Sequence, residues 1–170
     1  MTRNIILTGF MGTGKSTVGR FLAEHLHYTF CDLDSVIVQK EGQSINSIFA
    51  SMGEGYFREV ESAMLRAVLQ QSSQVVSTGG GAVIFEENRD LMKNTGVVIN
   101  LVASPETILQ RLHSDKERPL LRESKNLLQI QNLLKQRELF YAEAHIRIDT
   151  DGKNVEDVAR DILNFLERGA

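Results

Sequence analysis

Cysteine and long apolar runs are nearly absent from this chain, and each absence excludes a class of protein. The 170 residues include a single cysteine, Cys31, so no disulfide can form within the chain. That is typical of proteins from a reducing compartment. No run approaches the ~20 apolar residues that span a bilayer. The apolar run near the N-terminus is too short for a signal peptide, and no small-residue cleavage site follows it. We therefore expect a cytoplasmic protein.

An excess of basic charge is also missing. The net charge is −3, with 24% charged and 42% apolar residues. Broad binding to nucleic acid or to an anionic membrane favours a clearly basic surface, so we expect neither partner. The length fits a single domain, residues 1–170, that buries roughly 70% of the surface of the unfolded chain. We expect a monomer.

What is present is an alternation of short β-branched apolar runs and amphipathic stretches. The runs that predict strands are Ile5–Leu7, Phe30–Leu33, Val75–Ser77, Val97–Leu101 and His145–Ile148. The stretches that predict helices are Ser16–His27, Ser35–Lys40, Ser44–Met52, Tyr56–Gln70, Glu86–Lys93, Pro105–Leu112, Leu127–Tyr141 and Val155–Glu167. Strands that alternate with helices pair in parallel, which predicts a three-layer α/β/α sandwich. In such a fold ligands bind at the carboxyl ends of the strands.

The first predicted strand leads directly into a glycine-rich loop and a helix. Residues 9–16 read GFMGTGKS and match G-x-x-x-x-G-K-[ST], in the strand–loop–helix context that the motif requires. Glycines let the backbone close around phosphates, and the N–H groups at the helix start face the anion. In this motif the lysine, Lys15, reaches the β- and γ-phosphates, and Ser16 is a ligand of Mg²⁺. The loop predicts nucleotide binding, but GTPases, ATPases and kinases share it.

Two carboxylates follow the second predicted strand. Asp32 and Asp34 flank Leu33, and side chains two residues apart in an extended segment point the same way. Beside the phosphate loop, Asp32 would hold the hydration shell of Mg²⁺, and Asp34 would orient or deprotonate an attacking hydroxyl. The alternative is that Asp34 only caps the following helix, since Asp is a favoured cap.

Three further features have both a functional and a plain structural interpretation. The three glycines at 79–81 indicate close approach of the backbone to a ligand, with a simple turn as the alternative. Arg58 has Glu61 one helical turn later, which would aim its guanidinium. A solvated surface pair is the commoner outcome of that spacing. The charged segment 113–125 indicates a lid whose Arg118 closes over the phosphates, with a solvated loop as the alternative.

In order and spacing, these residues resemble the shikimate kinase family. The resemblance covers nearly the whole chain and is carried by Gly9–Thr17, Asp32–Asp34, Phe57 and Arg58 with Glu61, Ser77–Gly81, Arg118–Leu121, and Arg137 followed by Tyr141. It implies a five-stranded parallel sheet of the P-loop NTPase type in the order 2-3-1-4-5, related to nucleoside monophosphate kinases. It also implies an acceptor-binding subdomain at about residues 34–61 and a lid at about 113–124. Arg137 is singled out by the resemblance alone, because a lone helical arginine usually lies on the surface.

The resemblance implies Mg²⁺-dependent transfer of the γ-phosphoryl group of ATP to the 3-hydroxyl of shikimate. The product would be shikimate 3-phosphate, and the reaction would be a step of chorismate and aromatic amino-acid biosynthesis. The implied catalytic residues are Asp34, Lys15 and Arg118, and the implied metal ligands are Ser16 and Asp32. The implied shikimate contacts are Asp34, Arg58, Gly79, Gly80, Gly81 and Arg137. The implied ATP contacts are Gly12, Thr13, Gly14, Lys15, Ser16, Thr17, Arg111, Arg118, Lys153 and Asn154, of which the last two lie in a loop that departs from the proline-containing family pattern.

Two other functions stay open at this point. One is a kinase for another small acceptor, such as gluconate or a nucleoside monophosphate. A nucleotide acceptor would need hydrogen-bond donors for a base, and a gluconate site would lack the glycine triplet and the three arginines. The other is a nucleotide-binding regulatory module without catalysis, against which the intact Lys15, Asp34 and Arg118 argue.

Overall fold

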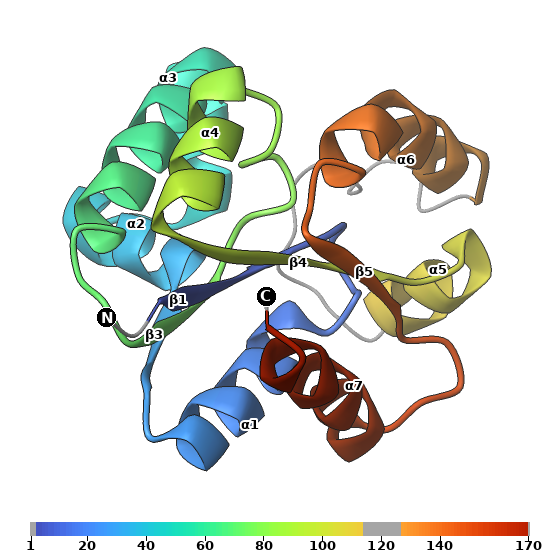
Figure 1. The fold of residues 1–170 in the computed structure, drawn as a ribbon. Helices are drawn as coiled ribbons and strands as arrows, with labels where there is room; N and C mark the ends of the chain where they lie inside the picture. The colour runs from blue at the N-terminus through green and yellow to red at the C-terminus, as the bar shows by residue number, and fades with distance from the viewer. Residues whose placement is uncertain (1–2, 114–126, 170) are drawn as a thin grey trace.

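The computed structural model describes residues 3–113 and 127–169, and at their centre lies a parallel sheet (Figure 1). Its strands are β1 (Asn4–Thr8), β2 (Thr29–Asp32), β3 (Gln74–Ser77), β4 (Gly96–Val102) and β5 (Ile146–Asp149). They lie in the order β2-β3-β1-β4-β5, and each neighbouring pair is parallel. The predicted five-stranded sheet and its strand order are confirmed.

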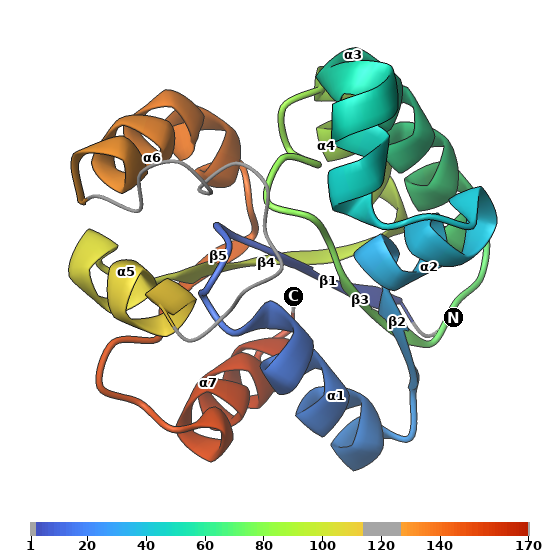
Figure 2. The ribbon, with the colours of Figure 1, turned by 180° about the vertical axis from the view of Figure 1, so that it is seen from behind.

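Helices cover both faces of the sheet, as Figure 1 and the reverse view in Figure 2 show. They are α1 (Lys15–Leu26), α2 (Leu33–Glu41), α3 (Ile45–Val68), α4 (Glu86–Thr95), α5 (Pro105–His113), α6 (Leu127–Tyr141) and α7 (Val155–Glu167). α1 and α7 lie on one face, and α2, α3 and α4 lie on the other together with the end of α6. This is the predicted three-layer α/β/α architecture. Among the described residues no helix is both long and apolar enough to cross a bilayer.

The central strand β1 is buried on both faces, which explains its unbroken apolar run. Ile5 and Leu7 pack into the core on the side of α1 and α7, and Ile6 packs into the core on the side of α2 and α3. All three are at most 3% exposed. Alternate side chains of a strand point to opposite faces, so one short segment anchors both layers of helices.

The register of the sheet brings three predicted functional segments to one edge. Leu7 of β1 lies opposite Ser77 of β3, and Ser77 in turn lies opposite Asp32 of β2. The phosphate loop, the segment from Asp32 to Asp34 and the glycines at 79–81 therefore begin side by side at the carboxyl ends of their strands, where parallel α/β sheets bind ligands.

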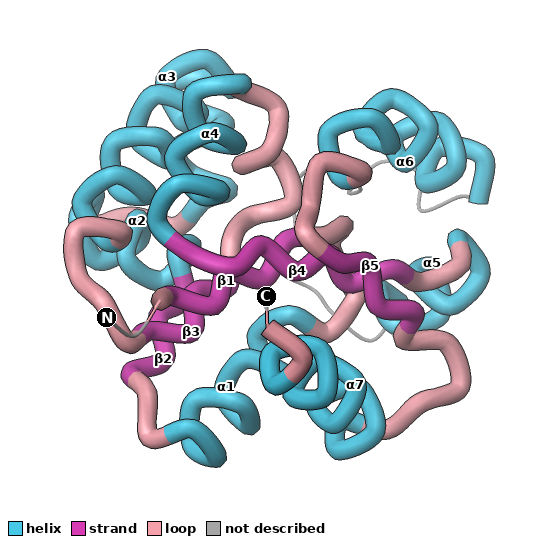
Figure 3. The backbone as a smooth tube through the Cα atoms, in the orientation of Figure 1, coloured by secondary structure: helices cyan, strands magenta, loops and turns pink. Residues whose placement is uncertain are grey.

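One predicted boundary is confirmed and another differs. The predicted helices Ser44–Met52 and Tyr56–Gln70 correspond to α3, where the non-helical Gly53 (φ 82°, ψ 171°) separates two helices across a kink; Figure 3 draws α3 in the helix colour. Glycine adopts this positive φ without steric cost, so the chain changes direction there. β2 ends at Asp32, and α2 begins at Leu33.

Candidate active site

The phosphate loop runs from the end of β1 into α1. Gly12 (φ 79°) and Gly14 (φ 92°) adopt left-handed backbone angles that glycine tolerates best. Lys15 is buried, and its Nζ donates hydrogen bonds of 2.9 Å to the carbonyl oxygens of Gly9 and Phe10. The helix N-cap is Gly14, which has no side chain to cap the first N–H groups of α1. The ammonium group and the helix start thus lie at one loop, which suits an anion.

A cluster of oxygen atoms lies beside the start of α1. The hydroxyl of Ser16 donates to Asp32 Oδ2 over 2.6 Å and lies 3.2 Å from the hydroxyl oxygen of Ser77. Mg²⁺ prefers oxygen ligands and in kinases is bound by few protein groups together with substrate phosphates. The donor set formed by Ser16 and Asp32 fits such an ion, and Ser77 lies within reach to hold one of its waters.

The two aspartates do not have the predicted relation. Asp32 ends β2, and its Oδ1 accepts a hydrogen bond from the backbone N–H of Ser35 over 3.1 Å, so Asp32 is the N-cap of α2. Asp34 lies in the first turn of that helix, and the argument from extended geometry is wrong because the strand ends before it. The alternative that Asp34 is the cap is also wrong. Asp34 Oδ1 instead lies 3.1 Å from where a Cβ on Gly79 would be, at the glycine triplet.

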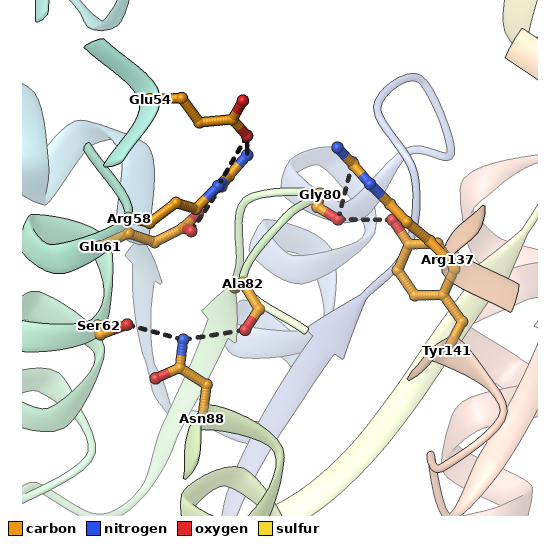
Figure 4. Close-up of polar contacts among 9 residues, drawn as sticks. All are labelled: Glu54, Arg58, Glu61, Ser62, Gly80, Ala82, Asn88, Arg137 and Tyr141. Carbon is orange, nitrogen blue, oxygen red and sulfur yellow. Dashed lines mark hydrogen bonds and ion pairs between the residues drawn. The ribbon is translucent and has the colours of Figure 1, made fainter. Parts of the chain in front are cut away.

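Arg58 and Glu61 form a buried ion pair on α3 (Figure 4). Arg58 Nη1 donates to Glu61 Oε2 over 2.6 Å, and the two side chains are 8% and 1% exposed. The alternative of a solvated surface pair is therefore wrong. Glu54, one turn earlier, accepts from Nε and Nη2 of Arg58 over 3.3 and 3.2 Å. Carboxylates on two sides fix the aim of the guanidinium plane.

Burial raises the pKa of the Glu61 carboxyl above its ordinary value, although the neighbouring positive charge of Arg58 lowers it. The negative charge of Asp34 adds to the rise. Within residues 3–113 and 127–169, the buried Oε1 of Glu61 has no hydrogen-bond partner. This oxygen lies against Gly79, where an added Cβ would be 2.5 Å from it.

The glycines at 79–81 make room for these charged side chains. A Cβ on Gly81 would overlap the guanidinium of Arg58, and a Cβ on Gly79 would clash with Glu61 Oε1. At Gly80 the added atom would be only in ordinary contact, 3.6 Å from Arg137 Nη1. A simple turn does not explain this pattern. The close approach is first of all to Arg58 and Glu61 within the chain.

The glycines at 79–81 belong to the loop between β3 and α4, residues 78–85, which we call the glycine loop. Arg137 reaches this loop from α6, on the side opposite Arg58 (Figure 4). Its Nη1 donates to the carbonyl oxygen of Gly80 over 3.2 Å, and the Tyr141 hydroxyl donates to the same oxygen over 2.6 Å. Arg137 is 7% exposed and lies 5.9 Å from the centre of the Phe10 ring, in the phosphate loop. Burial raises the pKa of Tyr141 to about 12, against the opposing charge of Arg137, so the phenol stays a hydrogen-bond donor.

The predicted adenine-side residues fall into two groups. Arg111 of α5 donates to the Gly12 carbonyl over 3.1 Å and to both the hydroxyl and the carbonyl oxygen of Thr150 over 3.2 Å, so it joins the phosphate loop to the segment after β5. Lys153 instead pairs with Asp161 at an exposed position, and the Asn154 side chain caps α7. Lys153 thus contacts the middle of α7, and Asn154 contacts its first turn.

Three of the named residues need separate mention. Thr13 is buried, and its hydroxyl donates to the Phe10 carbonyl over 2.8 Å, which braces the loop. Thr17 is exposed in the first turn of α1. Arg118 and the rest of the predicted lid from 114 to 124 lie outside the described residues.

Sequence reasoning missed two polar residues at this site. Glu54 lies four residues before Arg58, a spacing that could have been read as a second helical ion pair. Asn88 of α4 is 3% exposed, and its side-chain amide donates to Ser62 Oγ and to the Ala82 carbonyl, both over 3.0 Å. No local pattern marks an asparagine whose side chain bonds both to α3, 26 residues away, and to the loop six residues before it.

The family model, the curated relatives and the solved structures above 30% identity indicate one family. A family model described as shikimate kinase matches residues 11–167. The chain is 53% identical over 165 residues to a shikimate kinase of Geobacter metallireducens, covering 97% of this chain and 92% of that protein. It is 52% identical to a shikimate kinase of Geobacter sulfurreducens, covering 96% and 91% of the two chains. The structure of a shikimate kinase from Acinetobacter baumannii in complex with shikimate superposes with a TM-score of 0.95 at 39% identity, covering 99% and 94%.

Proposed function

The chain belongs to the shikimate kinase family, and from that premise we propose that it transfers the γ-phosphoryl group of ATP to the 3-hydroxyl of shikimate. The product is shikimate 3-phosphate, in the route to chorismate and the aromatic amino acids. One observation carries the proposal. Two buried arginines, Arg58 from α3 and Arg137 from α6, converge on the glycine loop that begins beside the phosphate loop. A carboxylate-bearing acceptor next to a triphosphate needs this arrangement of charge.

On the acceptor side, the guanidinium groups of Arg58 and Arg137 bind the shikimate carboxylate. Guanidinium–carboxylate contacts are charge-assisted and fix orientation as well as position. Because Glu61 and Glu54 hold Arg58, and the Gly80 carbonyl holds Arg137, both cations are aimed before the substrate arrives. Such preorganisation reduces the ordering that substrate binding requires.

Asp34 acts on the hydroxyl of the acceptor. Its carboxylate lies beside Gly79, close to the end of β3 and thus to the phosphate loop. There it accepts the hydrogen bond of the 3-hydroxyl and takes up the proton as the new oxygen–phosphorus bond forms. The bond between the γ-phosphorus and the β-bridging oxygen breaks, and ADP leaves with that electron pair.

On the nucleotide side, Lys15 and the N–H groups of the loop bind the phosphates. A bound β- or γ-phosphate competes with the Gly9 and Phe10 carbonyls for the Lys15 ammonium, which already lies at the loop. Ser16 and Asp32 would hold Mg²⁺, which would neutralise part of the phosphate charge. Arg111 stays a predicted contact of the adenine, and Arg118, outside the described residues, stays a predicted source of positive charge over the phosphates. Lys153 and Asn154 stay predicted ATP contacts. A cytoplasmic location and a monomeric state also stay predictions.

A coupled assay of ADP release tests the proposal. The purified chain is given ATP and Mg²⁺ with shikimate, quinate, gluconate or a nucleoside monophosphate as acceptor. We expect turnover with shikimate far above that with the other three, and phosphorus NMR should locate the new ester on the 3-hydroxyl. Faster turnover of gluconate or of a nucleotide would overturn the assignment.

A further inference from the structure

Asn88 links the two segments that build the arginine side of the acceptor site. It lies near the start of α4, and its side chain points between α3 and the glycine loop (Figure 4). Its Nδ2 donates to Ser62 Oγ and to the Ala82 carbonyl oxygen, both over 3.0 Å. A carbonyl oxygen can only accept, so the NH₂ end of the amide must face Ala82. Both of its N–H groups are used in bridging.

Each partner of Asn88 is next in sequence to a residue of the site. Ser62 follows Glu61, and Ala82 follows Gly81, where an added Cβ would overlap the guanidinium of Arg58. The Asn88 amide therefore spans the same separation, between α3 and the glycine loop, that Arg58 and Glu61 fill on the substrate side. An increase in this separation would move the Arg58 guanidinium away from the glycine loop.

A neighbouring contact shows that the start of α4 holds this loop along its length. Arg89 Nη1 donates to the carbonyl oxygens of Val83 and Ile84 over 2.9 and 3.0 Å. Arg89 also pairs with Glu143 after α6, so replacing it would disturb two regions at once. Among the described residues, the side-chain amide of Asn88 donates to α3 and to the glycine loop and to no third segment, so Asn88 is the more specific residue to change.

We propose that Asn88 is a positioning residue for acceptor binding: through Ser62 and Ala82 it sets the distance between the Arg58–Glu61 pair and the glycine loop, and so the aim of Arg58 at the substrate carboxylate. This inference rests on the proposed function, since it assigns Arg58 to that carboxylate. Asn88 itself does not touch the substrate. Its effect is on KM for the acceptor, and the nucleotide half of the site is separate from it.

Three variants of the full chain test the role by steady-state kinetics. Asn88→Ala removes both hydrogen bonds, and Ser62→Ala removes one while the Ala82 carbonyl keeps its donor. Asn4→Ala is the matched control: Asn4 is 2% exposed, donates to the Gln71 carbonyl over 2.7 Å and accepts from the Gln74 N–H over 3.1 Å. It lies at the start of the central strand β1, at the end of the strand away from the phosphate loop.

We expect KM for shikimate to rise about tenfold in Asn88→Ala and about threefold in Ser62→Ala, because small misplacements of a binding group are costly. KM for ATP should stay within about twofold in both variants. Asn4→Ala should lower the melting temperature while leaving both KM values unchanged. Unchanged KM for shikimate in Asn88→Ala, or equal rises for shikimate and ATP, would overturn the inference. Should Asn88→Ala not fold, the Ser62→Ala value decides alone. Wild-type turnover of shikimate reports on the proposed function independently of all three variants.

Discussion

A single added methyl group at Gly81 should weaken acceptor binding while nucleotide binding persists. The Cβ of Gly81→Ala would lie on the guanidinium of Arg58, far inside van der Waals contact. A carbon atom needs about 3.5 Å to a neighbouring heavy atom, so the guanidinium or the loop has to retreat by about 1 Å. Arg58 is 7% exposed, and the nitrogen that the added Cβ would meet first, Nη1, is the one that binds Glu61, so the retreat disturbs a buried ion pair. Gly81 does not have a positive φ, so the alanine backbone itself is unstrained.

A displacement of this size at a binding group lowers catalytic efficiency by about 10²-fold. We expect the loss as a higher KM for shikimate in the ADP-release assay, with KM for ATP nearly unchanged, because the added methyl lies at the Arg58 side of the site. Gly55→Ala on α3 is the control: apart from the backbone of its own helix and its chain neighbours, no heavy atom of the described residues lies within 4 Å of its added Cβ, so it adds a methyl group without crowding. Wild-type kinetics in Gly81→Ala, or equal loss in Gly55→Ala, would refute the steric reasoning.

Four other perturbations test the remaining parts of the site. Asp34→Asn should lower kcat by about 10²–10⁴-fold while ATP binding, measured by calorimetry, persists; unchanged kcat would remove Asp34 from the chemistry. Lys15→Ala should lower kcat by about 10²-fold or more through lost phosphate positioning, and a wild-type rate would contradict the phosphate-loop assignment. Arg58→Ala should raise KM for shikimate far more than KM for ATP, whereas equal rises would place Arg58 outside the acceptor pocket. The raised pKa of Glu61 means that the folded state binds its proton more tightly than the unfolded chain does. Its contribution to stability is therefore fullest below the ordinary pKa of the carboxyl and is lost as pH rises through the raised value. Glu61→Gln should remove that slope from the free energy of unfolding measured in urea, and an identical slope in both proteins would contradict the shift.

The local parts of the site could be predicted because their physics is local. The phosphate loop needs one strand end, a few glycines and one helix start in direct succession, and residues 9–16 supply all of them contiguously. The class of the sheet followed in the same way, since alternating strands and helices pair in parallel. The strand order could not be predicted from such local features, and its prediction rested only on the family resemblance.

The predictions that depended on the residue where one element ends and the next begins were wrong in part. The statement that Asp32 and Asp34 point the same way assumed an extended chain through Leu33, whereas α2 begins at that residue. Which of two nearby aspartates caps a helix is decided by a shift of one or two residues, and local propensity does not resolve such a shift. Asp34 nevertheless lies at the glycine triplet, because the turn of α2 carries it there.

By itself, the sequence determined the nucleotide half of this protein, from the contiguous loop around Lys15 to the parallel sheet that presents it. Only the tertiary structure decided the acceptor half. The i,i+3 spacing of Arg58 and Glu61 is the same on a solvated helix, and only packing of α3 against the glycine loop excludes water from the pair. Arg137 and Asn88 act through partners that are 57 and 6 to 26 residues away in the chain. Burial and aim are properties of the space between elements, and neither is encoded by any one segment.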